Sequence, residues 1–276
     1  MGAAVTRCKS GCAIMNKRCD RAPLCPSARR SAWPLHRGTP PLLLPPRRLH
    51  GDENKAIATA MSAAAIRHLS RDHALAGLIR RVGPPRLAAE IDRRCSPYEA
   101  LMRAIAHQQL HSRAARAILA RFLALHPGCI GFPDPAMVLA HPETVLRGCG
   151  FSAGKVASLL DICAHALNGT IPTRRGAARL SDEALIERLT AIRGVGRWTV
   201  EMLLIFSLGR PDVLPVDDFG VREGFRVLHG LEAQPKPRAL AEVGTAWAPY
   251  RSLAAWYLWR AAEAAKLGAR PAGGTE

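Results

Sequence analysis

From about residue 70 onward, apolar residues recur three and four positions apart, which is the spacing of one helix face. The first such set is Leu75, Leu78, Ile79 and Val82, and Gly83 followed by two prolines ends it. Strand-like alternation is scarce, and no glycine-rich phosphate loop follows a strand. The pattern therefore predicts an all-α protein and argues against a nucleotide-binding α/β fold.

Serines suited to helix capping predict where the next helices begin. Ser96 is followed by Pro97 and Glu99, which predicts a capping box with proline at the first helical position. The further predicted helices run from Ser112 to about Leu125, from Ser152 to near Gly169, from Ser181 to near Ile192, over 197–208 and over 249–265.

A short glycine turn separates two of these predicted helices. It comprises Arg193, Gly194, Val195, Gly196 and Arg197. Glycine permits a positive φ and close backbone approach, and free N–H groups at a helix start bind phosphate oxygens well. The two arginines add positive charge. The segment predicts a helix-hairpin-helix that grips a nucleic-acid backbone without reading its sequence, although a plain helix connection would explain the same glycines.

The charge of the chain points in the same direction. The formal net charge of the 276 residues is +17, and the excess continues beyond residue 60, where 28 Lys and Arg face 19 Asp and Glu. A basic surface favours polyanions because binding releases counterions from phosphates. Solubility or an arginine-biased genome would explain the charge equally well. The apolar run 41–45 is far too short to span a membrane.

Residues 1–60 differ from the rest of the chain. They are rich in Pro, Arg, Cys and Ser without sustained periodicity, which predicts disorder. An organellar transit peptide, or initiation at Met61 rather than Met1, would also explain them, and we favour Met61 because helical patterning begins just after it. We expect a folded core over 61–268 and a tail over 269–276. The cysteines of the first part, Cys8, Cys12, Cys19 and Cys25, form no zinc-type pair.

Several stretches together resemble the DNA glycosylases of the helix-hairpin-helix superfamily, most of all the DNA-3-methyladenine glycosylase II (alkylbase glycosylase) branch. They are 98–110, 150–155, 189–202, 214–221 and 247–259. They occur in colinear order over roughly residues 70–265. The resemblance implies two helical subdomains with the hairpin and an active-site cleft between them. Residues 1–60 do not look like the extra β-rich domain that some members carry.

The resemblance implies a monofunctional enzyme. It would flip alkylated purines such as 3-methyladenine and 7-methylguanine out of duplex DNA and hydrolyse their N-glycosidic bond, which initiates base excision repair. Two adjacent aspartates, Asp217 and Asp218, are candidates for the catalytic carboxylate that stabilises charge on the sugar and orients water. The family's Asp-Asp-aromatic pattern places the role on Asp218. A helix cap would explain either residue.

The same resemblance implies a pocket formed by Trp198, Met202 and Trp259. Bifunctional relatives carry a Schiff-base lysine at the place of Trp198, so we expect no lyase activity, and an aromatic face suits a cationic alkylated base. Leu110 resembles the wedge that fills the gap left by the flipped base, although a core leucine would look the same. Gln109 is expected to contact the opposite strand.

No cofactor is expected. Some superfamily members hold an iron–sulfur cluster through cysteines after the hairpin, but no cysteine follows Cys163. Relatives hold a monovalent cation through hairpin carbonyls, which the sequence neither requires nor forbids. The expected partner is double-stranded DNA with alkylated bases, bound by a monomer. The expected location is the cytoplasm at the nucleoid if the cell is bacterial, with an organelle as the minor alternative if residues 1–60 target it. Two alternatives are a non-catalytic hairpin DNA-binding module and a glycosylase for another damaged base.

Overall fold

The computed structural model describes residues 63–129 and 131–268, which all belong to one compact unit of the chain. Within these ranges the regular elements are helices and none is a strand, so the predicted all-α class is confirmed. The predicted extension 1–60, the choice between Met1 and Met61, the four N-terminal cysteines and the tail 269–276 lie outside the described residues.

The helices follow one another with short connections. An opening helix covers 63–69. The later elements are α2 (His73–Val82), α3 (Leu87–Glu90), α4 (Pro97–His107), α5 (Ser112–Ala124), α6 (Pro135–Leu139), α7 (Glu143–Gly148), α8 (Ala153–Leu167), α9 (Arg174–Ala177), α10 (Asp182–Thr190), α11 (Arg197–Leu203), η1 (Leu204–Leu208), α12 (Phe219–His229), α13 (Pro237–Gly244), η2 (Thr245–Trp247) and α14 (Arg251–Gly268).

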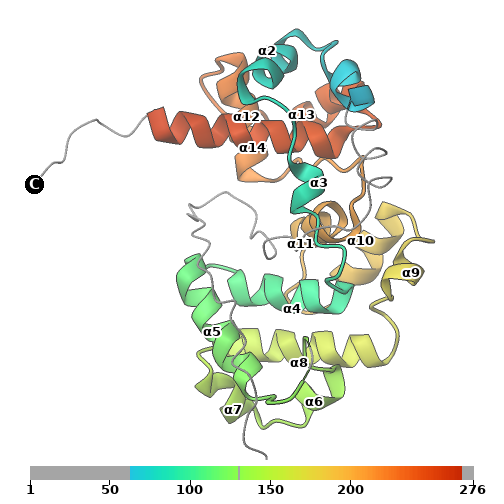
Figure 1. Ribbon diagram of the computed structural model, residues 1–276, viewed down its shortest axis with the longest axis vertical. Coiled ribbons are helices and arrows are strands. Elements are labelled where there is room, and N and C mark those ends of the chain that lie inside the picture. Colours follow the sequence, from blue (N-terminus) through green and yellow to red (C-terminus); the bar gives the residue numbers. More distant parts are fainter. Residues whose placement is uncertain (1–62, 130, 269–276) are drawn as a thin grey trace, which may run out of the picture. The chain divides into compact units, whose positions relative to one another are not determined.

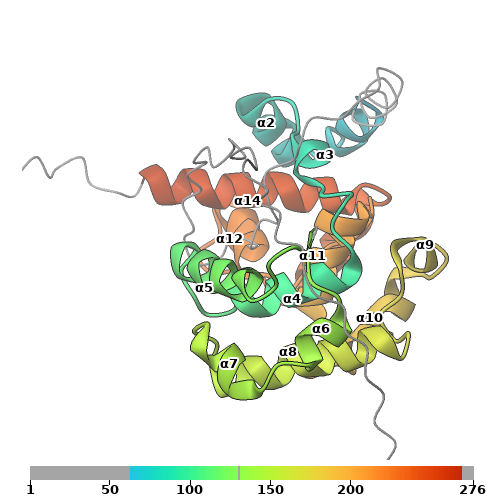
Figure 2. The same cartoon turned by 60° about the horizontal axis from the view of Figure 1, so that its bottom comes forward.

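Two groups of helices make up this unit (Figures 1 and 2). In the first, α4 packs on α5 and α8, and α8 also carries α6 and α7. In the second, α12 packs along α14, and α2 contacts both. The hairpin helices α10 and α11 pack on each other, and α11 also contacts α4. The arrangement agrees with the predicted pair of helical subdomains, and one continuous cluster of buried apolar side chains runs through both.

Local sequence signals explain most helix starts. The side chains of Ser96, Ser152 and Ser181 each accept a hydrogen bond from a backbone N–H of the first turn, at 3.1, 3.3 and 3.1 Å, so these three caps are confirmed. Two details were wrong. The Glu99 carboxylate accepts from Arg103 one turn on, at 2.8 Å, rather than completing a capping box. His111, not Ser112, caps α5.

The predicted helix over 197–208 is confirmed with a change of geometry. After Leu203 the chain continues as a π-helix over Leu204–Leu208, and Gly209 ends it with φ +71°. A π-turn widens the helix by one residue per turn and is frequent near functional sites. Gly209 begins the loop that leads to Asp218.

The backbones of α12 and α14 approach each other closely at Gly224. A Cβ there would overlap the Leu258 carbonyl, so only glycine allows this crossing. α14 is enclosed over most of its length, with its tryptophan, tyrosine and leucine run at 256–259 all buried. Trp256 Nε1 donates to Glu90 and Tyr257 Oη to the Gly83 carbonyl. Four consecutive residues are buried because elements surround this helix on several sides.

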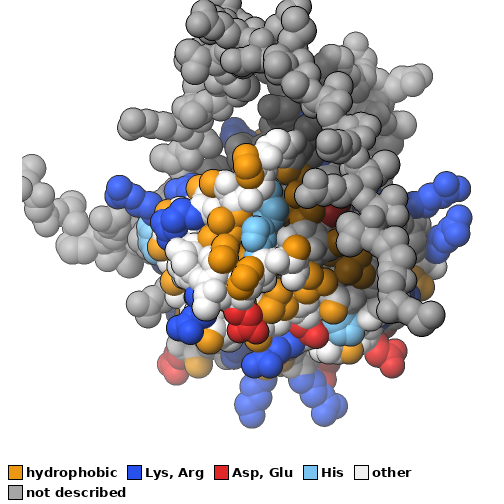
Figure 3. Space-filling view, turned by 90° about the horizontal axis from the view of Figure 1, so that it is seen from below, with side chains coloured by type: hydrophobic (Ala, Val, Ile, Leu, Met, Phe, Trp, Pro, Cys, Tyr) orange, Lys and Arg blue, Asp and Glu red, His pale blue; other side chains and the backbone are white. Residues whose placement is uncertain are grey.

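The end of the molecule formed by α6 and α7 is partly apolar. Seen from below, hydrophobic side chains gather in the middle of this face, with Lys and Arg mostly toward its edge (Figure 3). The exposed large apolar residues of these two helices are Met137, Leu139 and Val145. Among the described helices, none is both long and apolar enough to cross a bilayer.

Candidate active site

Asp218 lies at the N-terminus of α12, and only 4% of its surface is exposed. Its Oδ1 accepts from the Val221 backbone N–H at 2.8 Å, so Asp218 caps the helix. The neighbouring Asp217 is exposed to solvent. The cap and the candidate catalytic group are therefore the same residue, and the structure separates the two aspartates clearly by burial.

Two tryptophans converge on the Asp218 carboxylate. Trp259 Nε1 donates to Oδ1 at 2.8 Å, and Trp198 Nε1 donates to Oδ2 at 2.6 Å. The three donors are all N–H groups, which an ionised carboxylate accepts without rearrangement. One comes from α11, one from the start of α12 and one from α14. The carboxylate is thus held rigidly by three separate elements.

The loop before Asp218 is anchored on α14. Arg251 forms a bidentate pair with Asp212, at 2.7 and 2.9 Å. The buried Ser252 hydroxyl donates to the Arg210 carbonyl at 2.7 Å and accepts from Val213 N–H at 2.9 Å. These contacts fix the loop on both sides of Asp212, so that Asp218 enters α12 at a set position.

The two tryptophans differ in accessibility. Trp259 is 1% exposed, and the centroid of its ring lies 5.6 Å from that of Phe206. Its Nε1 edge faces the site through the hydrogen bond to Asp218. Trp198 is only partly buried. Met202 is buried on α11, four residues after Trp198 and on the same side of the helix. The structure therefore brings Trp198, Trp259 and Asp218 into direct contact, and the role of Met202 in a pocket stays a prediction.

The glycine turn joins α10 to α11, as predicted. Gly194 has φ +78°, whereas Gly196 has φ −92°, so one of the two glycines uses the left-handed region. Arg193, Gly194, Gly196 and Arg197 are exposed, and Val195 is buried. Val195 can therefore meet a ligand only through its backbone.

The predicted wedge lies beside this hairpin. Gln109 has φ +56°, in the left-handed region, and Leu110 is 38% exposed. Residues 108–110 form the turn between α4 and α5, which we call the wedge turn. Gln108 Nε2 donates to the Gly194 carbonyl at 3.0 Å. The turn and the hairpin, 86 residues apart in sequence, are thus joined directly.

The family assignment follows from comparison with known proteins. Residues 102–249 match the family model described as HhH-GPD superfamily base excision DNA repair protein, and this stretch contains the wedge turn, the hairpin and Asp218. The chain belongs to the HhH-GPD superfamily. The predicted family is therefore confirmed.

HhH-GPD relatives of both fungi and bacteria are similar to the chain. DNA-3-methyladenine glycosylase 1 of Schizosaccharomyces pombe is 44% identical over 214 residues, which cover 78% of this chain and 93% of that protein. The structure of the S. pombe 3-methyladenine DNA glycosylase Mag1 with abasic DNA matches with a TM-score of 0.63 at 46% identity, over 71% of this chain and 95% of that one. A DNA-3-methyladenine glycosidase structure from Bacillus halodurans matches with a TM-score of 0.65 at 32% identity, over 72% and 89% of the two chains.

Sequence reasoning missed Glu201, one turn after Trp198 in this HhH-GPD site. It is 2% exposed; its Oε1 accepts from Arg197 Nε at 3.0 Å, and its Oε2 is buried with no hydrogen-bond partner among the described residues. Burial raises the pKa of Glu201 to about 7, opposed by Arg197 and assisted by the charges of Asp217 and Asp218. A glutamate between apolar residues of a predicted helix was the only signal that could have indicated it.

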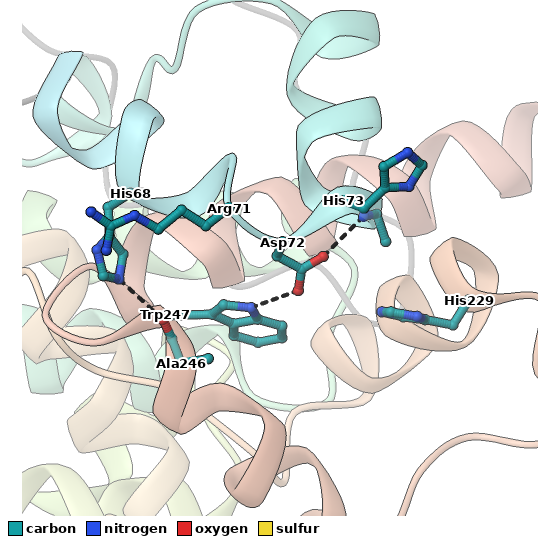
Figure 4. Close-up of a pocket in the computed structure, with 8 residues that line it drawn as sticks. His68, Arg71, Asp72, His73, His229, Ala246 and Trp247 are labelled. Carbon is teal, nitrogen blue, oxygen red and sulfur yellow. Dashed lines mark hydrogen bonds between the residues drawn. The ribbon is translucent and has the colours of Figure 1, made fainter.

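A separate pocket lies between α2 and η2 (Figure 4). It is lined by His68, Arg71, Asp72, His73, Ala74, His229, Ala246 and Trp247, none of which was a predicted site residue. Trp247 Nε1 donates to Asp72 Oδ2 at 3.0 Å, while the other carboxylate oxygen caps α2. The hydrogen bond between Trp247 and Asp72 therefore joins α2 to the segment before α14.

Side chains of the types that ligate metals, and free thiols, also occur among the described residues. No cluster of three or more His, Cys, Asp or Glu suited to a metal ion occurs over 63–129 and 131–268. Cys95, Cys129, Cys149 and Cys163 are free thiols, and all but Cys129 are buried. Burial raises the pKa of the Cys163 thiol to about 11 and that of Cys95 to about 12, so both stay protonated at neutral pH.

Proposed function

We propose that this protein is a monofunctional DNA glycosylase that removes alkylated purines, such as 3-methyladenine and 7-methylguanine, from duplex DNA by base flipping. The single observation that carries the proposal is the buried Asp218 carboxylate, held by two indole N–H groups and a helix start. Membership of the HhH-GPD superfamily and the names of the similar fungal and bacterial proteins support the substrate class.

Asp218 supplies the charge that the reaction needs. As the bond from C1′ to the base nitrogen breaks, its electron pair leaves with the base and positive charge develops on the sugar. A fixed carboxylate near C1′ stabilises that charge without reorganising. It also orients the water that adds to C1′ and takes up the proton that this water releases. Among the described residues Oδ2 accepts only from Trp198, so this oxygen keeps a lone pair for the sugar or the water.

Trp198 supports both the proposed lesion preference and the expected lack of strand cleavage. Its N–H holds Asp218, while its partly exposed ring offers a face to the flipped base. An alkylated purine is cationic, and an aromatic face attracts a cation more than a neutral base. An indole cannot form an imine with the sugar, and the hairpin contains no lysine. We therefore expect base release without lyase activity and without an organic or redox cofactor.

The hairpin and the wedge turn would bind the DNA. The N–H groups around Gly194 and Gly196 at the start of α11, with Arg193 and Arg197 beside them, suit backbone phosphates. Leu110 is 38% exposed in the turn joined to the hairpin, which supports its proposed role as the wedge. A monomer carries all these parts on one chain. The protein would work in the compartment that holds its DNA, which is the cytoplasm if the cell is bacterial.

Base release from duplex DNA containing 7-methylguanine tests the proposal. Wild type is compared with Asp218→Asn and with Asp217→Asn, a matched change of the exposed neighbour. We expect release by wild type and Asp217→Asn and a loss of at least about 10²-fold in Asp218→Asn, the size typical of removing a preorganised electrostatic group.

The other outcomes discriminate between the alternatives. DNA binding without release by wild type would support a non-catalytic hairpin module or a different lesion, which a panel of deaminated and oxidised bases would separate. Release by Asp218→Asn but not by Asp217→Asn would move the catalytic role to the exposed aspartate. Strand cleavage by wild type, detected on denaturing gels without alkali, would refute the monofunctional assignment.

A further inference from the structure

The stretch Gly150–Lys155 resembles a family block but has no role in the function proposed above. Lys155 lies in the first turn of α8, and its Nζ donates to the Ala106 and Gln108 carbonyls, at 2.9 and 2.7 Å. These oxygens belong to the last turn of α4, where carbonyls lack helical partners. Burial lowers the pKa of Lys155 from its usual value. Two of the three N–H donors of the ammonium are therefore directed at the end of α4.

The residues that Lys155 holds lead directly into the wedge turn. Gln108 is the C-cap of α4, Gln109 follows with φ +56°, and Leu110 is the exposed apolar residue. A non-glycine residue in the left-handed region is strained and persists only where its surroundings hold it. Lys155 anchors the Gln108 carbonyl on one side, and the Gln108 amide bonds to the Gly194 carbonyl on the other. The strained turn is held between α8 and the hairpin.

The same face of α8 also holds the hairpin. Lys155, Ser158 and Asp161 lie three residues apart and so share one side of the helix. Asp161 Oδ2 accepts from the Arg193 N–H at 2.7 Å, and a Cβ on Gly194 would come within 2.5 Å of the Ser158 hydroxyl. One rigid helix therefore contacts both loops that are expected to meet DNA.

We propose that Lys155 is a positioning residue that fixes the Gln109–Leu110 wedge relative to the hairpin grip. The inference rests on the proposed function. When the hairpin holds the phosphates, the distance to the wedge decides whether Leu110 enters the stack beside the target base. Misplacing a positioning group by about 1 Å costs on the order of 10²-fold in rate. Replacing Lys155 should therefore slow base release more for a substrate whose base is harder to extrude from the duplex.

The test compares two duplexes under single-turnover conditions. One has 7-methylguanine paired with cytosine, and the other has it opposite a mismatched base, where extrusion costs less. Lys155→Met keeps the aliphatic chain and removes the ammonium, whereas Lys155→Arg keeps a charged donor. We expect Lys155→Met to slow release from the paired duplex by at least about tenfold more than from the mismatched one, and Lys155→Arg to restore most of the loss. This ratio does not depend on the fraction of folded protein.

A double-mutant cycle shows whether Lys155 acts through the wedge. Leu110→Ala alone should slow base release from the paired duplex. Adding Lys155→Met should slow release little further, because both changes impair insertion of the same wedge. Equal slowing of both duplexes by Lys155→Met, or multiplication of the two single effects, would overturn the inference. Absence of release by wild type on either duplex would instead overturn the proposed function on which the inference rests.

Discussion

Replacing Glu201 by glutamine tests whether a buried carboxyl group destabilises this fold at neutral and alkaline pH. Glutamine has the same shape, and its Oε1 can still accept from Arg197. Its amide nitrogen takes the place of Oε2, which has no partner in the described part of the chain. The change therefore removes a titratable proton with little change of packing.

The magnitude follows from the pKa shift. The pKa of Glu201 rises from 4.5 to about 7 in the folded state, so between these values the folded protein binds more protons than the unfolded chain. The contribution of Glu201 to stability is therefore fully present below about pH 4.5, and it is lost progressively as the pH rises from there through 7. A shift of this size corresponds to about 3 kcal/mol at 1.36 kcal/mol per pKa unit.

Urea unfolding at pH 5, 6, 7 and 8 measures the effect. Relative to wild type, we expect Glu201→Gln to gain about 2–3 kcal/mol between pH 5 and pH 8. Glu242→Gln is the control, because Glu242 has the same helical spacing to an arginine, Arg238, but is exposed to solvent. An unfolding free-energy difference between Glu201→Gln and wild type that stays constant over this pH range would refute the reasoning.

Three further predictions follow from single contacts. Gly224→Ala should destabilise the protein by about 3 kcal/mol or prevent folding, because its Cβ overlaps the Leu258 carbonyl, whereas Gly154→Ala, in open space at the start of α8, should not lower the melting temperature. An unchanged melting temperature for Gly224→Ala would contradict the close helix crossing. Trp198→Phe keeps an aromatic ring but removes the donor to Asp218; single-turnover base release should fall by about tenfold or more, and an unchanged rate would show that this hydrogen bond does not serve the reaction. Because the chain has a formal charge of +17, its affinity for a short duplex should fall by at least about tenfold between 50 and 200 mM salt. Fluorescence anisotropy measures this affinity, and a flat salt dependence would argue against phosphate contacts.

Much of the fold was predictable because its signals are local. Ser96, Ser152 and Ser181 each cap a helix through an N–H three residues on, so the relevant atoms lie within one turn. The glycine turn between two helices depends on backbone freedom at Gly194 and was likewise visible. The cap of α5 was missed because His111 and Ser112 are adjacent and both can accept a hydrogen bond.

The family motif placed Asp218, Trp198 and Trp259 in the sequence, but not the bonds between them. Those bonds join residues 20 and 41 positions apart, and they exist because α11, α12 and α14 meet at one point. The predicted role of Trp198 was an aromatic face. Its second role, as a donor to the carboxylate, depends on helix packing and could not be inferred from residue spacing.

What the sequence determined by itself was therefore the helices, the hairpin and the residue types of the site, since propensity, capping and turn chemistry act over a few residues. Tertiary structure alone decided which groups are buried and which atoms meet. It separated Asp218 from Asp217 by burial, left one Glu201 oxygen without a partner among the described residues, and brought Lys155 to the end of α4. Burial and long-range hydrogen bonds depend on how helices cross, and the crossing at Gly224 is set by contacts on both helices together.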